Sequence, residues 1–311
     1  MTLNNPHYIL SPGTQIVTAT DITQPDGSIA VIRGAVGVVI KSPSDHRHAY
    51  RIRLIDGTEV SLKRHEIAIK KHYQNPRDPN GNETDQHADL YDYVIYRCVV
   101  GSRAYGLDSA DSDTDLRGFY LPPTARYWSI YGVPEQLVNE EREECYWEIQ
   151  KFIMLALKAN PNILECLYTP LVEHVTPLAQ ELLDLREIFV SKMIYQTYNG
   201  YVMSQFKKLN KHLEKHGSIR WKHAMHLIRL LISGIDGLET GVIPVQVPDA
   251  YRDQLLAIRD GKTPWEEVNQ WRLDLHHDFD AAFNASQLPD RPDYERANEF
   301  LIAARRAALE G

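Results

Sequence analysis

One stretch, residues 94–121, constrains the fold more than any other part of the chain. It reads VIYRCVVGSRAYGLDSADSDTDLRGFYL. The apolar start predicts a buried strand, Gly101 and Ser102 predict a tight turn, and a short connection then leads to a second strand. The second strand would carry Asp113 and Asp115. Because residues two apart on a strand point the same way, both carboxylates would face one side.

The acidic pair and the turn together predict a site for a metal ion and a phosphate group. Two like charges placed together are costly unless a cation neutralises them. Mg²⁺ prefers oxygen ligands and is often held by one or two carboxylates with substrate phosphates. A glycine-containing turn after a strand lets backbone N–H groups approach a phosphate closely. We therefore expect a phosphate cradle at Gly101 and Ser102 beside a metal site at Asp113 and Asp115.

The combination of these residues resembles the nucleotidyltransferase superfamily of DNA polymerase beta. That pattern is a hydrophobic residue, Gly, then Gly or Ser, a spacer, and two acids that flank a hydrophobic residue, which is Thr114 here. Further phrases make the chain similar to the RNA-ligase-associated branch, RlaP, from about Val94 to Arg305. These phrases are YWEIQKFIMLALKANPNILECLYTP, GYVMSQFKKL, KHAMHLIRLL and LPDRPDYERAN.

The resemblance implies an α+β fold with a polymerase-beta-like nucleotidyltransferase core, a small mixed sheet with helices, at 89–170. It implies a metal-dependent nucleotidyltransferase that uses two Mg²⁺ or Mn²⁺ ions, moves NMP from a nucleoside triphosphate to a hydroxyl and releases pyrophosphate. Such a site needs a third carboxylate from a neighbouring strand, and the candidates are Glu141, Glu143 and Glu144. Related chains place it five residues before the acid that opens the next helix, here Glu148, which favours Glu143 as a catalytic metal ligand.

Arg103 and Arg117 are candidate phosphate clamps, because a guanidinium group matches phosphate with two parallel hydrogen bonds. Pairing of Arg117 with a core acid is the alternative. The acceptor implied by the resemblance is RNA, in end processing or repair. Transfer to a protein, as in toxin-like or antitoxin-like relatives, and a non-catalytic nucleotide- or RNA-binding module are the competing hypotheses.

A basic stretch lies far from this region in the sequence. Residues 205–230 contain seven Lys or Arg and a single acid, in a chain with net charge −8. Lys222, His226 and Arg229 fall at i, i+4 and i+7, so they would share one face of a helix. That face could bind a triphosphate tail or an RNA backbone, and a solvated helix surface is the plainer interpretation of the lysines before it.

The remaining chain predicts a small β-rich domain, a linker and a helical domain. Residues 1–72 alternate short β-rich runs with turns and resemble a small KOW-type β-barrel, with Asp56-Gly57 as a hairpin turn. Residues 73–88 are polar and rich in Pro, Asn and Asp, as in a linker. Residues 171–311 show no strand signal. We expect helices there near 178–185, 190–215, 219–238, 249–259, 264–283 and 291–308.

Composition excludes some classes of protein and favours a cytoplasmic one. With 311 residues, 43% of them hydrophobic, the chain can form two or three domains. It has no apolar run of the length that spans a membrane and no signal peptide, so we expect no membrane partner. The cysteines Cys98, Cys145 and Cys166 lack metal-binding spacing, which predicts reduced core residues.

Overall fold

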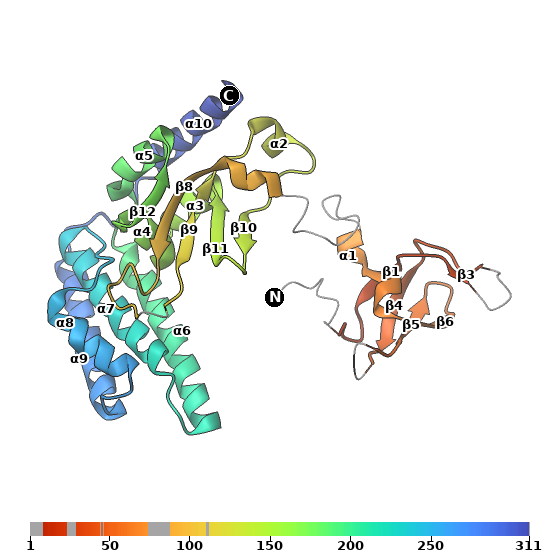
Figure 1. Ribbon diagram of the computed structural model, residues 1–311, viewed down its shortest axis with the longest axis horizontal. Coiled ribbons are helices and arrows are strands. Elements are labelled where there is room, and N and C mark those ends of the chain that lie inside the picture. The colour runs from red at the N-terminus through yellow and green to blue at the C-terminus, as the bar shows by residue number, and fades with distance from the viewer. Residues whose placement is uncertain are drawn as a thin grey trace. The chain divides into compact units, whose positions relative to one another are not determined.

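The computed structural model describes residues 9–23, 29–43, 45, 47–73, 88–109 and 112–310. The chain divides into two compact units, Met1–Ala88 and Asp89–Gly311, and Figure 1 shows both as ribbons. Most of the predicted linker at 73–88, and the turn at 25–27, lie outside the described residues. No helix in the described part of the chain is long and apolar enough to cross a membrane.

The first unit is built from short antiparallel strands. Its main sheet has the order β6-β5-β4-β1-β7, and β2 pairs with β3 separately. The strands are β1 (Gln15–Thr18), β2 (Ile22–Thr23), β3 (Ile29–Val31), β4 (Val36–Lys41), β5 (Tyr50–Leu54), β6 (Glu59–Leu62) and β7 (Ile67–Ile69), followed by α1 (Lys70–Tyr73).

The alternation of apolar and polar residues explains this sheet. Ile16, Val39 and Ile52 point inward from three adjacent strands and are almost fully buried. The Asp56-Gly57 turn joins β5 to β6 as predicted, with Gly57 at φ +87°. The predicted barrel is not closed in the described residues, because no ladder joins β6 to β7. β7 is only three residues long and runs directly into α1, which leaves few backbone groups for such a ladder.

The second unit contains a mixed sheet with the order β10-β11-β9-β8-β12. Its strands are β8 (Val94–Val100), β9 (Asp115–Tyr120), β10 (Gln136–Asn139), β11 (Glu144–Glu148) and β12 (Val172–Val175). β9 and β11 are parallel, and the other neighbours are antiparallel. β8 and β9 approach closely at Gly118, where an added Cβ would lie 1.9 Å from the Tyr96 carbonyl oxygen. Only glycine fits at this crossing.

Helices make up the rest of this unit. They are η2 (Ala88–Tyr93), α2 (Thr124–Trp128), α3 (Ile149–Ala156), α4 (Pro161–Tyr168), α5 (Pro177–Asp184), η3 (Arg186–Phe189), α6 (Met193–His216), α7 (Trp221–Thr240), α8 (Asp249–Arg259), α9 (Trp265–Ala285) and α10 (Tyr294–Glu310). All six helices predicted beyond residue 171 are confirmed to within a few residues. The expectation of no strand there was wrong, because β12 pairs with β8 at the sheet edge. The β12 side chains are exposed, so no apolar alternation marked it.

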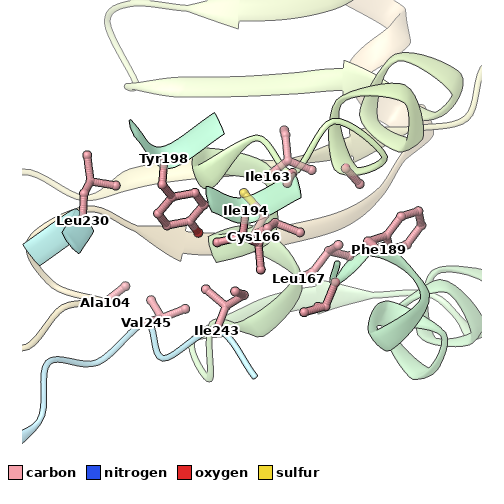
Figure 2. Packing of buried hydrophobic residues seen from close by; sticks show 14 of the residues in the cluster. Ala104, Ile163, Cys166, Leu167, Phe189, Ile194, Tyr198, Leu230, Ile243 and Val245 are labelled. Atoms are coloured by element: carbon pink, nitrogen blue, oxygen red, sulfur yellow. The ribbon is translucent and has the colours of Figure 1, made fainter. Parts of the chain in front are cut away.

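One hydrophobic core joins the sheet to the helices. A single cluster of buried apolar side chains runs from Tyr96 in β8 to Ala304 in α10. Figure 2 shows its centre, where Ile163 and Cys166 of α4 lie near Tyr198 of α6. No separate core therefore marks the boundary predicted at residue 170. The mixed α+β character expected from the sequence is confirmed.

Candidate active site

The Gly101 turn follows β8 and is closed by its own backbone. The Tyr105 N–H donates to the Gly101 carbonyl at 3.1 Å, and the Leu107 N–H donates to the Ser102 carbonyl at 2.9 Å. Gly101 has φ +75°, a conformation that side chains with a Cβ rarely adopt. A Cβ added there would lie 2.7 Å from Oδ2 of Asp115. The turn and the acidic pair, predicted to be neighbours, are thus in contact through Asp115.

Asp115 owes its position to the start of β9. It pairs with Val100, the last residue of β8, which brings its carboxylate against the turn. Its side chain is 37% exposed, so a ligand can reach it. Asp113 is exposed and lies before the strand, so strand alternation does not fix its direction. The predicted placement of both aspartates on one strand therefore holds for Asp115 only.

Two arginines flank this pair, as predicted. Arg117 Nη2 lies 3.0 Å from Asp115 Oδ1, and its Nη1 donates to the Glu143 carbonyl at 2.7 Å. Arg117 thus pairs with Asp115, an acid of the candidate site, and not with a core acid, which was the alternative. Arg103 Nη2 donates to the Ser112 carbonyl at 2.8 Å. The two guanidinium groups therefore bond to the two ends of residues 112–115, Arg103 at Ser112 and Arg117 at Asp115.

The register of β11 separates the candidates for a third carboxylate. Glu144 pairs with Leu116 in the parallel ladder, so it points to the face opposite Asp115. Glu143 is one residue earlier, and its carbonyl accepts the Leu116 N–H at 3.1 Å. Its φ of +53° lies in the left-handed region, which is uncommon for a residue other than glycine. Glu143 is thus bonded through its backbone to the residue after Asp115, while Glu141 is exposed and lies two residues earlier in the chain.

The donor chemistry suits a hard divalent cation. Asp113 and Asp115 offer carboxylate oxygens, which Mg²⁺ prefers, and the space that a Cβ at Gly101 would fill lies beside one of them. Among the described residues, no three His, Cys, Asp or Glu side chains converge as a metal-binding group. The full ligand set of Asp113, Asp115 and Glu143 therefore stays a prediction.

The predicted basic face of α7 runs from solvent into the core. Lys222 is exposed, His226 is half-buried and Arg229 is buried. Burial, with the charges of Arg229, Lys222 and His223, lowers the pKa of His226 to about 3. His226 is thus neutral near pH 7, and of these three residues only Lys222 presents a charge to solvent.

Arg229 forms a buried cluster that sequence reasoning missed. Its Nη2 lies 2.8 Å from Glu165 Oε1, where both side chains are less than a tenth exposed. Its guanidinium carbon lies 3.6 Å from the centre of the Tyr105 ring, and the Tyr105 hydroxyl donates to Glu165 Oε2 at 2.7 Å. The signal in the sequence was one charge on the apolar face of each of two helices, α4 and α7.

This cluster connects the helices to the Gly101 turn. Tyr105 belongs to the turn that Gly101 opens, since its N–H bonds the Gly101 carbonyl. The ring of His226 packs edge-on against Tyr105, with 6.0 Å between ring centres. The buried Arg229 therefore packs against the turn that Gly101 opens.

Comparison with known proteins identifies two sequence relationships. Residues 77–303 match the sequence profile of RlaP, described as the RNA repair pathway DNA polymerase beta family. The "Uncharacterized protein YcgL" of Bacillus subtilis (strain 168) is 30% identical over 151 aligned residues. That alignment covers 40% of this chain and 58% of the relative.

Proposed function

The chain belongs to the RNA repair pathway DNA polymerase beta family, and on that premise we propose that it is a nucleotidyltransferase that transfers NMP from a nucleoside triphosphate to a hydroxyl of RNA. The observation that carries the proposal is the contact between Gly101 and the Asp115 carboxylate. It supports the proposal because such a reaction requires a phosphate-binding turn beside a metal-binding side chain. The mixed sheet with α3 and α4 is then the nucleotidyltransferase core.

The reaction is an in-line displacement at phosphorus. The acceptor hydroxyl oxygen bonds to the α-phosphorus, the bond between the α-phosphorus and its bridging oxygen breaks, and pyrophosphate leaves. Asp113, Asp115 and Glu143 would hold two Mg²⁺ or Mn²⁺ ions. When bound, these ions supply charge stabilisation to the attacking and leaving oxygens. The Glu143 carboxylate would take the hydroxyl proton.

The remaining residues bind and orient the triphosphate. The backbone N–H groups at Gly101 and Ser102 would donate to its β- and γ-phosphates. Arg103 is exposed and borders the turn, so its guanidinium can rotate to a phosphate. Arg117 keeps Asp115 oriented through their ion pair. The Arg229, Glu165 and Tyr105 cluster holds the turn in place from behind.

The proposal is tested by removing one charge at a time. Asp115→Asn and Asp113→Asn should each lower Mg²⁺-dependent transfer by at least about 10²–10³, the scale for losing one electrostatic stabiliser. Asp108→Asn is the matched control, because Asp108 is an exposed acid of the same connection. The assay offers each of the four labelled triphosphates, with Mg²⁺ or Mn²⁺, to total RNA and to cell protein.

The outcomes separate the competing functions. Label in RNA that disappears in folded Asp115→Asn and persists in Asp108→Asn supports the proposal. Label in protein identifies a protein acceptor instead. Binding of triphosphate with no transfer under any condition identifies a non-catalytic module, and full activity of folded Asp115→Asn removes the metal-site assignment.

A further inference from the structure

A strongly basic surface lies on the hairpin formed by α6 and α7. In Figure 1 the two helices run beside each other to a common end, where residues 217–220 connect them. Six exposed cations lie on the second half of α6, the connection and the first turn of α7. We call them the basic hairpin surface: Lys207, Lys208, Lys211, Lys215, Arg220 and Lys222.

The cations of this surface lie close enough to act on each other. Beside burial, Arg220, Lys208 and Lys222 lower the pKa of His223, so charges from both helices reach one point. Burial, Arg220 and Lys215 similarly lower the pKa of His212. Like charges held together repel, and a bound polyanion would relieve that repulsion.

No carboxylate neutralises this surface within the described residues. The ion pairs there involve none of the six cations, whereas lysines elsewhere in the unit do pair, as Lys151 does with Glu135 at 2.6 Å. The lone acid of the stretch, Glu214, is exposed among them. A chain of net charge −8 therefore concentrates unpaired positive charge on one hairpin.

The arrangement on α6 suits a polymer of regularly spaced charges. Lys207, Lys211 and Lys215 are four residues apart, so they follow one line along the helix at intervals of about 6 Å. No large apolar side chain is strongly exposed among the described residues 204–223. A helix that binds a membrane surface needs such an apolar face. The basic hairpin surface is therefore better suited to a polyanion that is bound through its phosphate groups than to a lipid surface.

The basic hairpin surface leads toward the candidate active site. Lys222 is one helical turn from His226, and the His226 ring packs on Tyr105. Tyr105 in turn bonds the backbone of Gly101. A strand bound along α6 and past Lys222 would thus extend in the direction of the phosphate turn.

We propose that the basic hairpin surface binds the phosphate backbone of a single RNA strand, the acceptor of the reaction. This inference rests on the proposed function for the role of the strand as acceptor. It assigns Lys222 to the acceptor and not to the triphosphate. Contacts to phosphates position a strand without reading its sequence, so binding is independent of base sequence.

The magnitude follows from counterion release. For a single strand, the logarithm of the binding constant falls with the logarithm of salt concentration by about 0.7 per neutralised phosphate. Six contacts give a slope of about −4, which is a loss of about 300-fold in affinity between 50 and 200 mM salt. Removing Lys207, Lys211 and Lys215 halves the slope to about −2, and the loss becomes about 20-fold.

The experiment measures binding of labelled single-stranded RNA by fluorescence anisotropy, without triphosphate, over this salt range. The test variant is Lys207→Gln, Lys211→Gln and Lys215→Gln together, in the full chain. The control variant is Lys158→Gln, Arg291→Gln and Arg306→Gln, which removes three exposed charges from other parts of the unit. Circular dichroism confirms that each variant is folded.

A reduced slope in the test variant with an unchanged slope in the control supports the inference. Equal slopes in the test variant and the wild type overturn it. The inference is also overturned if the wild type binds anionic lipid vesicles but not RNA, and the test variant loses that vesicle binding. Wild-type protein that transfers no nucleotide but binds RNA through these lysines would refute the proposed reaction and leave the assignment of this binding surface intact.

Discussion

Replacing Gly101 by alanine tests two separate demands on one position. The first is conformational: φ is +75°, and a left-handed residue with a Cβ costs about 1–2 kcal/mol. A less flexible unfolded chain returns about 0.4–1 kcal/mol. The net loss of stability is about 1 kcal/mol, which lowers Tm by about 2–4 °C for a unit of this size.

The second demand is space for the Asp115 carboxylate. The new Cβ would lie 2.7 Å from Asp115 Oδ2, so the carboxylate must move by about 0.7 Å to reach ordinary contact. A displacement of about 1 Å in a catalytic group can reduce the rate about 10²-fold. Gly101→Ala should therefore keep its fold and lose about 10²-fold in nucleotide transfer.

Gly241→Ala supplies the matched control. Gly241 ends α7 with φ +73°, and its added Cβ would lie 3.4 Å from Leu288 Cδ2, which is ordinary contact. The two variants should lose similar stability in thermal unfolding, while only Gly101→Ala loses transfer activity. Full activity in Gly101→Ala, or an equal loss in Gly241→Ala, would refute the reasoning about Asp115.

Two further predictions concern the interior behind the turn. Arg229→Met leaves Glu165 buried without its cation and should lower the free energy of unfolding, measured in urea, by about 3–5 kcal/mol. Lys222 is exposed on the same helix, so the control Lys222→Met should change that free energy by less than about 0.5 kcal/mol. Equal effects of the two substitutions would contradict a stabilising ion pair between Arg229 and Glu165. The pKa of His226 is lowered to about 3 against about 6.5 in an unfolded chain, so only the unfolded state takes up a proton between these values. Stability should fall as pH drops from about 6.5 toward 3, and His226→Phe, which keeps a ring against Tyr105, should flatten that fall in urea titrations at each pH.

Local patterns predicted most of the secondary structure. The extents of α7 and α9 were predicted to within a few residues, because α9 buries one apolar face against the core and α7 is mostly apolar and buried throughout residues 227–234. The Asp56-Gly57 hairpin followed from turn chemistry alone. β12 was missed because it is a short, exposed edge strand, whose only support is its hydrogen bonding to β8.

The candidate site was predictable in its residues but not in all of its geometry. The alternation of strand residues predicted that Asp113 lies on the strand. Just before it, however, the Ser109 N–H donates to the Ser112 hydroxyl and the Ser112 N–H donates to the Ser109 carbonyl. Such local bonds compete with a strand ladder, so β9 begins only at Asp115. The ion pair between Arg229 and Glu165 joins residues 64 positions apart. Helical spacing within one segment cannot predict a contact with another segment, so this pair could not be found from the sequence pattern.

The buried salt link also determines how the molecule can be divided. A fragment that stopped near residue 170 would keep Tyr105 and Glu165 but lose Arg229, the cation from α7 that pairs with Glu165. The Glu165 carboxylate would then be left without its cation, and the Gly101 turn would lose its contact with Arg229. The smallest fragment that keeps the turn and its buried ion pair together must therefore extend at least through α7.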